Sequence, residues 1–204
     1  MKSGFTQSKT IHLLINASMA LLWAVFAVRH IGAFKSSGQV TYLLICLSET
    51  MIAAFFILRR APVSVSQHPA DWVLAIVGTF APLFLVPSPS AGLTWASYVI
   101  APGVVLQLLG VLSLNRSFGL VAAKRRIKTS GLYRFVRHPL YASYILVLIG
   151  YVAGNVAWRN MAIAIVTIAC HVARMVREER HLAQDAAYVE YMKCVPYRLV
   201  PLMF

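Results

Sequence analysis

Long apolar runs alternate with short polar segments along the chain. Four such runs predict membrane-spanning helices, at residues 10–33, 40–58, 71–86 and 95–114. A helix rises about 1.5 Å per residue, so about 20 apolar residues cross a hydrocarbon layer roughly 30 Å thick. The first half of the chain is therefore expected to be a membrane anchor.

The last apolar run is interrupted by a polar segment at residues 154–160. Each half is about as long as one crossing, which predicts a helical hairpin of residues 139–154 and 160–175. An amphipathic helix is expected from about Arg174 to Met192, because apolar positions recur at helical spacing there. The tail holds Pro196 and Pro201 and cannot be helical. The expected fold is thus an all-α integral membrane protein of four transmembrane helices, a C-terminal helical hairpin and a cytoplasmic amphipathic helix.

Single residues in these runs predict local features. Asp71 is placed as a helix N-cap, and Pro82 predicts a kink. Arg29 and His30 lie near the end of the first run, where both are expected to reach the membrane interface.

Composition supports the membrane assignment. The 204 residues are 59% hydrophobic and 12% charged, whereas a soluble domain carries about a quarter charged residues. The net charge of +13 lies at the ends of apolar runs, so it favours anionic headgroups over nucleic acid as the partner. A bilayer is therefore the expected environment, and nucleic-acid binding is not expected.

The polar loop between residues 115 and 138 carries several Arg and Lys residues and no acid. Such a loop is typical of the cytoplasmic side of a membrane. Counting crossings from this loop places the N-terminus, the C-terminus and the polar clusters around residues 133–141 and 174–201 in the cytoplasm.

Glu49 stands in the middle of the second apolar run. A carboxyl group at that depth is costly and usually faces a bundle interior or a cavity. Two interpretations stay open: a hydrogen-bonded Glu that packs two helices, or a residue at a substrate cavity.

Two polar clusters flank the last hairpin. The first comprises Tyr133, Arg137, His138, Pro139 and Tyr141, where a loop meets a span. Pro139 suits a first helical turn, so His138 would lie at a helix N-terminus that favours an anion. The alternative is simple anchoring at the membrane interface.

The second cluster is the adjacent pair Glu178 and Glu179. Surface pairing with nearby arginines is the alternative to a functional role. The remaining five histidines and three cysteines show no metal-ligand spacing, so no metal site is predicted and these histidines receive no role.

These clusters, together with Gly131-Leu-Tyr133, Arg137-His-Pro-Leu-Tyr141, Tyr188-Val-Glu-Tyr191 and the tail from Val195 to Pro201, resemble the isoprenylcysteine carboxyl methyltransferase family of membrane enzymes. Phosphatidylethanolamine N-methyltransferases are more distant relatives. The likeness covers about the last 90 residues in order and spacing. It implies one domain over residues 1–204, in which 10–114 anchor the chain and 115–204 bind the cofactor and carry catalysis.

The resemblance implies an enzyme that uses S-adenosylmethionine at the cytoplasmic face. The residues implied to bind this cofactor are Arg125, Arg126, Ile127, Lys128, Tyr133, His138, Pro139, Leu140, Tyr141 and Glu179. Glu178 is the second choice for the acid. Arg174 is implied as the arginine that faces the acceptor, with Glu49 as a further substrate contact.

The expected acceptor is lipophilic or amphiphilic, either a small molecule or a lipidated substrate. The family favours an isoprenylcysteine-type carboxylate, while a phospholipid amine or a small thiol stays open. A carboxylate or thiolate needs no general base, whereas an amine or neutral thiol must lose a proton, and no motif names the base. A non-enzymatic carrier that uses Glu49, or a membrane-surface adaptor, is the remaining alternative.

Overall fold

The computed structural model describes residues 9–58, 68–88, 93–114 and 127–203, and all its regular elements in these ranges are helices. In chain order the elements are α1 (Lys9–Ser37), α2 (Val40–Leu58), α3 (Pro69–Phe80), the 3₁₀ turn η1 (Ala81–Phe84), α4 (Ala96–Leu114), the 3₁₀ turn η3 (Gly131–Arg134), α5 (Pro139–Gly154), α6 (Trp158–Leu182) and α7 (Ala186–Cys194). The all-helical prediction is confirmed for these residues.

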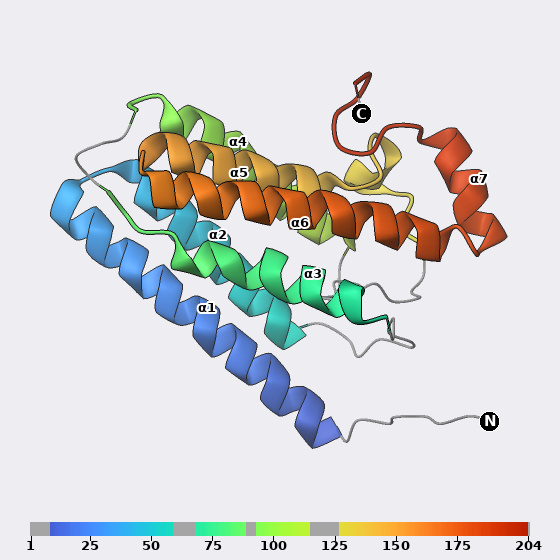
Figure 1. Cartoon of the computed structure of the whole chain (residues 1–204), viewed down its shortest axis with the longest axis horizontal. Coiled ribbons are helices and arrows are strands. Elements are labelled where there is room, and N and C mark those ends of the chain that lie inside the picture. Colours follow the sequence, from blue (N-terminus) through green and yellow to red (C-terminus); the bar gives the residue numbers. More distant parts are fainter. Residues whose placement is uncertain (1–8, 59–67, 89–92, 115–126, 204) are drawn as a thin grey trace.

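The long helices form one elongated bundle, with α7 and the C-terminal tail at one end (Figure 1). Helix α1 packs on α2, α4 packs on both α2 and α5, and α3 packs on α6. The core between α2, α4 and α5 includes Ile45, Ile100 and Leu148. Gly150 allows the close α4–α5 contact, because a Cβ there would lie 2.5 Å from Ile100 Cγ1.

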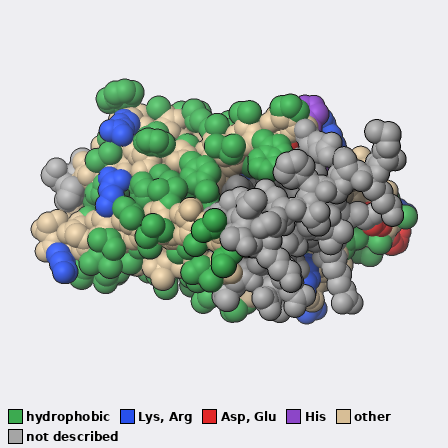
Figure 2. Space-filling model, turned by 90° about the horizontal axis from the view of Figure 1, so that it is seen from below, with side chains coloured by type: hydrophobic (Ala, Val, Ile, Leu, Met, Phe, Trp, Pro, Cys, Tyr) green, Lys and Arg blue, Asp and Glu red, His purple; other side chains and the backbone are tan. Residues whose placement is uncertain are grey.

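Apolar side chains cover much of the outer surface, as a lipid environment requires. Leu13, Leu21 and Val28 on α1 are each more than 60% exposed. The described part of the face seen in Figure 2 is covered largely by hydrophobic side chains. The buried polar side chains lie inside the bundle instead.

Within the described residues, three helices are long and apolar enough to cross a membrane: Asn16–Ser37, Ala96–Leu114 and Trp158–Leu182. The apolar helices Val40–Ala54, Pro69–Phe84 and Pro139–Gly154 are shorter. An integral membrane protein is thus supported, whereas four transmembrane helices plus a hairpin stays a prediction. Which side of the membrane each terminus faces also stays a prediction.

The predicted break between residues 154 and 160 is present, and two asparagines organise it. The Asn155 carboxamide oxygen accepts hydrogen bonds from the Tyr42 hydroxyl (2.8 Å) and the Ser88 amide (2.7 Å). Asn160 donates to the carbonyl groups of Val86 (3.0 Å) and Asn155 (2.8 Å). Both asparagines are fully buried, so their side chains tie α2 and the segment after η1 to the turn between α5 and α6.

The predicted start of α3 is wrong. His68, not Asp71, is the N-cap, and its Nδ1 accepts a hydrogen bond from the Ala70 amide. Pro69 occupies the first helical turn, and Asp71 turns toward α6, where it pairs with Arg177. Pro82 does end the α-helix, since the chain continues there as η1.

The amphipathic segment is also different from the prediction. Helix α6 runs without a break from Trp158 to Leu182, so Arg174 lies well inside it. The chain then turns, and Asp185 caps a separate helix α7 by accepting from the Ala187 amide (3.0 Å). This break lets α7 fold back over the end of the bundle (Figure 1).

The interface position predicted for His30 is wrong. Arg29 is exposed, but His30 is 3% exposed and points into the bundle. One helical residue turns the direction of a side chain by about 100°, so neighbours can face lipid and core.

Candidate active site

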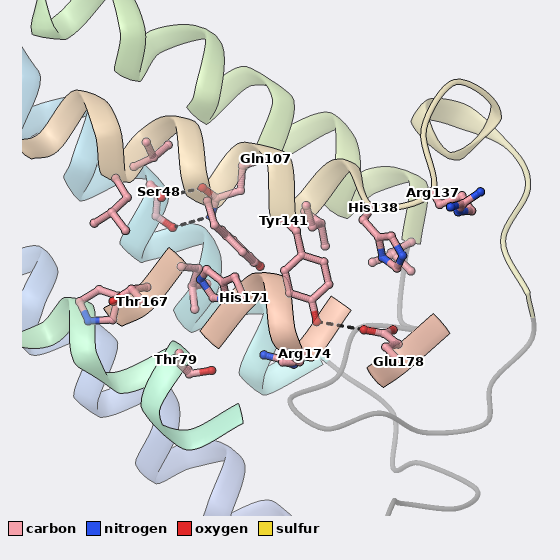
Figure 3. Close-up of a pocket in the computed structure, with 18 of the residues that line it drawn as sticks. Ser48, Thr79, Gln107, Arg137, His138, Tyr141, Thr167, His171, Arg174 and Glu178 are labelled. Atoms are coloured by element: carbon pink, nitrogen blue, oxygen red, sulfur yellow. Dashed lines mark hydrogen bonds between the residues drawn. The ribbon is translucent and has the colours of Figure 1, made fainter. Parts of the chain in front are cut away.

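A cavity of about 270 Å³ extends from the α7 end of the bundle into its interior. Its polar end is lined by Lys128, Tyr133, His138, Glu178 and Tyr188, and its inner end by residues of α1, α2, α4 and α5. Such a space suits a ligand that has both a polar and an apolar part. Figure 3 shows the labelled residues that line it.

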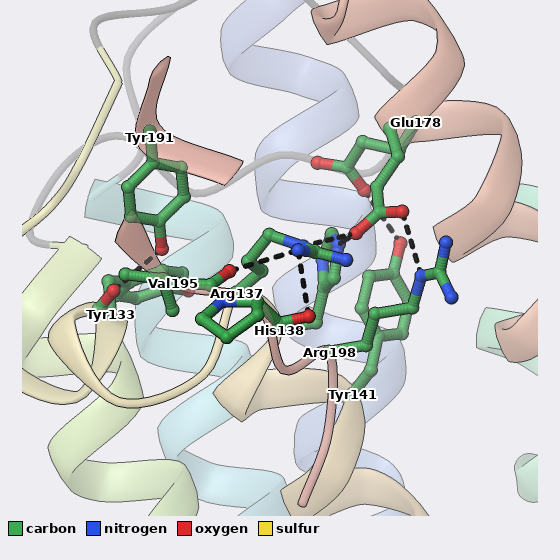
Figure 4. Close-up of polar contacts among 10 residues, drawn as sticks. Tyr133, Arg137, His138, Tyr141, Glu178, Tyr191, Val195 and Arg198 are labelled. Atoms are coloured by element: carbon green, nitrogen blue, oxygen red, sulfur yellow. Dashed lines mark hydrogen bonds and ion pairs between the residues drawn. The ribbon is translucent and has the colours of Figure 1, made fainter. Parts of the chain in front are cut away.

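Glu179 holds the polar end together from behind the cavity wall. Its carboxylate accepts hydrogen bonds from Arg137 Nε (2.7 Å) and Arg198 Nε (2.8 Å), and His138 Nε2 lies 3.1 Å from it. Arg137 also donates to the carbonyl groups of Val195 (2.9 Å) and Pro196 (3.0 Å) (Figure 4). One buried carboxylate thus joins α6, the start of α5 and the C-terminal tail.

The backbone completes this junction. The amide of Arg137 donates to the Tyr197 carbonyl, and the amide of His138 donates to the Arg198 carbonyl, each at 2.9 Å. His138 is the residue before the first turn of α5, as the sequence predicts. The Arg198 carbonyl of the tail therefore accepts from the His138 amide, a group that was expected to bind an anion.

Glu178 faces the cavity, unlike its neighbour. The Tyr141 hydroxyl donates to the Glu178 carboxylate at 2.9 Å, and both side chains line the cavity (Figures 3 and 4). The contact joins α5 to α6 and leaves a carboxylate at the cavity wall. A carboxylate there suits a ligand ammonium or hydroxyl groups.

Three tyrosines form an aromatic wall beside these acids. Tyr191 donates to the Tyr133 carbonyl at 2.6 Å, and the rings of Tyr188 and Tyr191 are 5.6 Å apart. Burial raises the pKa of Tyr191 to about 12, and burial together with nearby Glu178 raises the pKa of Tyr133. Burial also raises the pKa of Tyr188. All three hydroxyls are thus neutral hydrogen-bonding groups near pH 7.

Arg174 and His171 lie farther in along α6. The Arg174 guanidinium carbon is 5.6 Å from the Tyr141 ring centroid, a cation–π distance, and Arg174 lines the cavity. His171, one turn earlier, is 5% exposed and contacts the rings of Tyr141 and Tyr144. These side chains form the middle of the cavity.

The inner end holds a polar group at membrane depth. Glu49 Oε2 lies 3.0 Å from His30 Nδ1, and His30 Nε2 lies 3.4 Å from the Tyr151 hydroxyl. Beside them the Ser48 hydroxyl donates to the Gln107 carboxamide oxygen at 2.7 Å. Glu49 therefore both packs helices together and lines the cavity, while its contact with a substrate stays a prediction.

The structure brings most of the predicted site residues together. Ile127, Lys128, Tyr133, His138, Leu140, Tyr141, Arg174 and Glu49 line the cavity. Pro139 is buried at the start of α5, and Glu179 lies behind the wall. Arg125 and Arg126 lie outside the described residues. None of these placements tests a binding role, so each role stays a prediction.

No role was predicted for His30 and His171, yet both line the cavity. Their position within apolar helices is the signal that could have found them, because ionisable residues at membrane depth usually face a cavity. Among the described residues, no cluster of three or more His, Cys, Asp or Glu could hold a metal ion.

The helical bundle and its cavity fit the class of membrane-embedded enzymes, and one comparison names the reaction. Residues 94–185 match the model of a family described as phospholipid methyltransferase, a membrane methyltransferase family. No curated protein matches the sequence. The matched region contains α4, α5 and α6, which supply much of the cavity wall.

The match confirms the prediction of a methyltransferase enzyme and supports S-adenosylmethionine as the methyl donor. It also supports a lipid environment and a lipophilic substrate. The more specific resemblance to isoprenylcysteine carboxyl methyltransferases is not confirmed by it and stays a prediction.

Proposed function

We propose that the chain transfers a methyl group from S-adenosylmethionine to an amphiphilic acceptor inside the described cavity. The observation that carries this proposal is one continuous cavity that joins a charged end, with Glu178 and Lys128, to an interior among membrane helices. A polar cofactor and an apolar acceptor can meet in such a space. The residues of the cavity would contribute chiefly by holding the acceptor in line with the methyl group. Such positioning lowers the barrier to methyl transfer by roughly 7–11 kcal/mol in favourable cases.

The residues at the polar end fit the cofactor. Glu178 suits its ammonium or ribose hydroxyls, and Lys128 suits its carboxylate. The rings of Tyr133 and Tyr188 offer faces for the adenine. S-adenosylmethionine would supply an electrophilic methyl group there, and the chain would hold its polar groups and exclude water.

We assign different parts to the two adjacent acids. Glu178 contacts the cofactor, because it lies on the cavity wall. Glu179 supports the site by holding Arg137, His138 and Arg198 in place. Arg125 and Arg126 remain candidate contacts from the basic loop, which we place on the cytoplasmic side.

The inner half of the cavity is proposed to take the acceptor. Arg174 would contact it near the cofactor, and Glu49 would contact it at the inner end, where its partner is His30. A phospholipid amine gains support from the description of the matching family. An isoprenylcysteine-type carboxylate and a small thiol remain the other acceptors of this proposal.

Calorimetric titration with S-adenosylhomocysteine tests cofactor binding directly. The detergent-purified protein is expected to bind it saturably, and Glu178→Gln is expected to weaken binding about 10- to 100-fold by removing a charge-assisted hydrogen bond. Glu190→Gln is the matched control, because Glu190 is exposed and pairs only with Lys193 among the described residues. Absence of binding in a folded wild-type sample would overturn the proposal.

A further inference from the structure

His171 occupies the middle of the cavity, between the two ends already described. It extends from α6 and lies one turn before Arg174. Its ring centroid is 5.7 Å from that of Tyr141 and 5.6 Å from that of Tyr144. In Figure 3 it lies beside Tyr141, on the side away from Glu178. A ligand that reached from one end to the other would pass this imidazole.

The Nδ1 atom of His171 is buried and has no hydrogen-bond partner among the described residues. Nearly all buried polar atoms have a partner, so an exception requires an explanation. Neighbouring polar groups are paired: Thr167 donates to the Ile163 carbonyl at 2.8 Å and Ser48 donates to Gln107 at 2.7 Å. Within the part of the chain that the structure describes, His171 Nδ1 thus has no partner although Thr167 and Ser48 nearby are paired.

Gly78 of α3 lies close to this nitrogen. A Cβ at position 78 would lie 3.4 Å from His171 Nδ1 and 3.2 Å from the Cβ of Cys170. Gly78 is itself part of the cavity lining. Any larger residue would crowd Nδ1, so the glycine lets α3 pack closely against His171.

We propose that His171 Nδ1 removes the proton from an acceptor whose nucleophilic atom is protonated at neutral pH, an ammonium or a thiol. This inference rests on the proposed function and makes a carboxylate the wrong acceptor class, because a carboxylate has no proton to lose. The placement suits a general base: Nδ1 is buried and unpaired in the described part of the chain, and the ring contacts Tyr141, whose hydroxyl donates to the proposed cofactor residue Glu178. A positioned base of this kind contributes about 10²- to 10⁴-fold in rate.

The step balances without a further reagent. The N–H or S–H proton moves to Nδ1, and the electron pair left on nitrogen or sulfur forms the new bond to the methyl carbon. The bond between that carbon and the donor sulfonium breaks, and its electron pair stays on sulfur as a neutral thioether. The imidazolium of His171 releases its proton to water after the products leave.

The test compares His171→Asn with His181→Asn. Asparagine approximates the shape around Nδ1 but cannot accept a proton, and His181 lies on the same helix outside the cavity lining. Single-turnover rates are measured with phosphatidylethanolamine, 1-decanethiol and N-acetyl-S-farnesylcysteine as probes. His171→Asn is expected to lower the rate with the amine or the thiol at least about 100-fold. The probe whose rate of methylation falls in His171→Asn identifies the chemical class of the acceptor.

Two readouts besides rate keep the result interpretable. S-adenosylhomocysteine binding is expected to be unchanged in His171→Asn. If the thiol is the acceptor, ultraviolet difference absorbance with 1-decanethiol and S-adenosylhomocysteine is expected to report a thiolate in wild type and none in the variant. Added imidazole is expected to restore the rate of His171→Ala.

A second variant covers the case in which substitution of His171 prevents folding. Gly78→Ala keeps the base and crowds Nδ1, so it is expected to slow transfer about tenfold with cofactor binding unchanged. Gly32→Ala is its control, since no atom lies within 4 Å of the added Cβ there. An unchanged rate in both His171→Asn and Gly78→Ala, or wild-type activity on the carboxylate probe alone, would overturn this inference. Failure of wild type to bind S-adenosylhomocysteine would overturn the proposed function itself and this inference with it.

Discussion

The Tyr141 hydroxyl donates to the Glu178 carboxylate at 2.9 Å, across the wall of the cavity between α5 and α6. The next residue, Glu179, points away from the cavity and contacts Arg137, His138 and Arg198. Of the two adjacent acids, Glu178 thus lies on the cavity wall and Glu179 holds the surrounding segments together. A substitution of Glu179 is expected to act first on stability, whereas one of Glu178 is expected to act on ligand binding.

Glu179→Gln is expected to destabilise the protein by about 3–5 kcal/mol, because it leaves the buried Arg137 without its anionic partner. Thermal unfolding in detergent, followed by circular dichroism, measures the change. Protease sensitivity of the tail beyond Val195 is expected to rise, since Arg137 and Arg198 link that tail to Glu179. Glu190→Gln, at an exposed site, is expected to stay within about 0.5 kcal/mol of wild type. Equal stability of the two variants would show that the Glu179 cluster does not hold the tail.

Gly131→Ala is expected to destabilise the turn before α5 more than Gly38→Ala destabilises the turn after α1. Both glycines have positive φ, 64° and 70°, so each alanine costs about 1–2 kcal/mol of backbone strain. At Gly131 the added Cβ would also lie 2.2 Å from Ser113 Oγ, whereas it meets nothing within 4 Å at Gly38. The difference between their unfolding midpoints measures the steric part alone. A cost no larger at Gly131 would contradict this close contact.

Asn160→Ala is expected to cost about 2–4 kcal/mol, because it leaves the Val86 amide and the carbonyl groups of Val86 and Asn155 without partners. Arg159→Ala removes the exposed neighbouring side chain and is expected to be nearly neutral. Chemical denaturation in matched detergent gives both values. A small effect at Asn160 would mean that water satisfies these groups instead.

Tyr191→Phe is expected to cost about 1–2 kcal/mol by removing the 2.6 Å hydrogen bond to the Tyr133 carbonyl. Tyr98→Phe is the control, because Tyr98 is 80% exposed. Thermal shift measurements near pH 7 compare the two variants with wild type. Equal changes of the melting temperature in the two variants would show that the Tyr191 hydroxyl does not hold η3 in place.

Alkaline pH tests the same tyrosine in the wild type. Burial raises the pKa of Tyr191 to about 12 in the folded protein, while the unfolded chain loses this proton near pH 10. The contribution of Tyr191 is therefore fully present below about pH 10 and is lost as the pH rises from about 10 to 12. The stability difference between wild type and Tyr191→Phe is expected to shrink over that interval. A difference that stays constant up to pH 12 would contradict the raised pKa.

The order of the helices and most of their limits could be predicted because they depend on local pattern. Apolar run length set the limits of α2 and α4, and Gly154 with Asn155 marked the turn between α5 and α6. The break between α6 and α7 was missed, because the apolar spacing continues through it while Asp185 starts a new helix. The start of α3 was missed because the capping role passed to His68.

The sequence by itself determined a helical membrane protein, the order of its helices and the two polar clusters that flank the last hairpin. Only the tertiary structure decided which side chains face the cavity. That choice depends on how each helix is rotated against partners far away in sequence, and a rotation of about 100° separates Glu178 from Glu179. The same reason applies to His30 and His171, whose surroundings come from α2, α3 and α5.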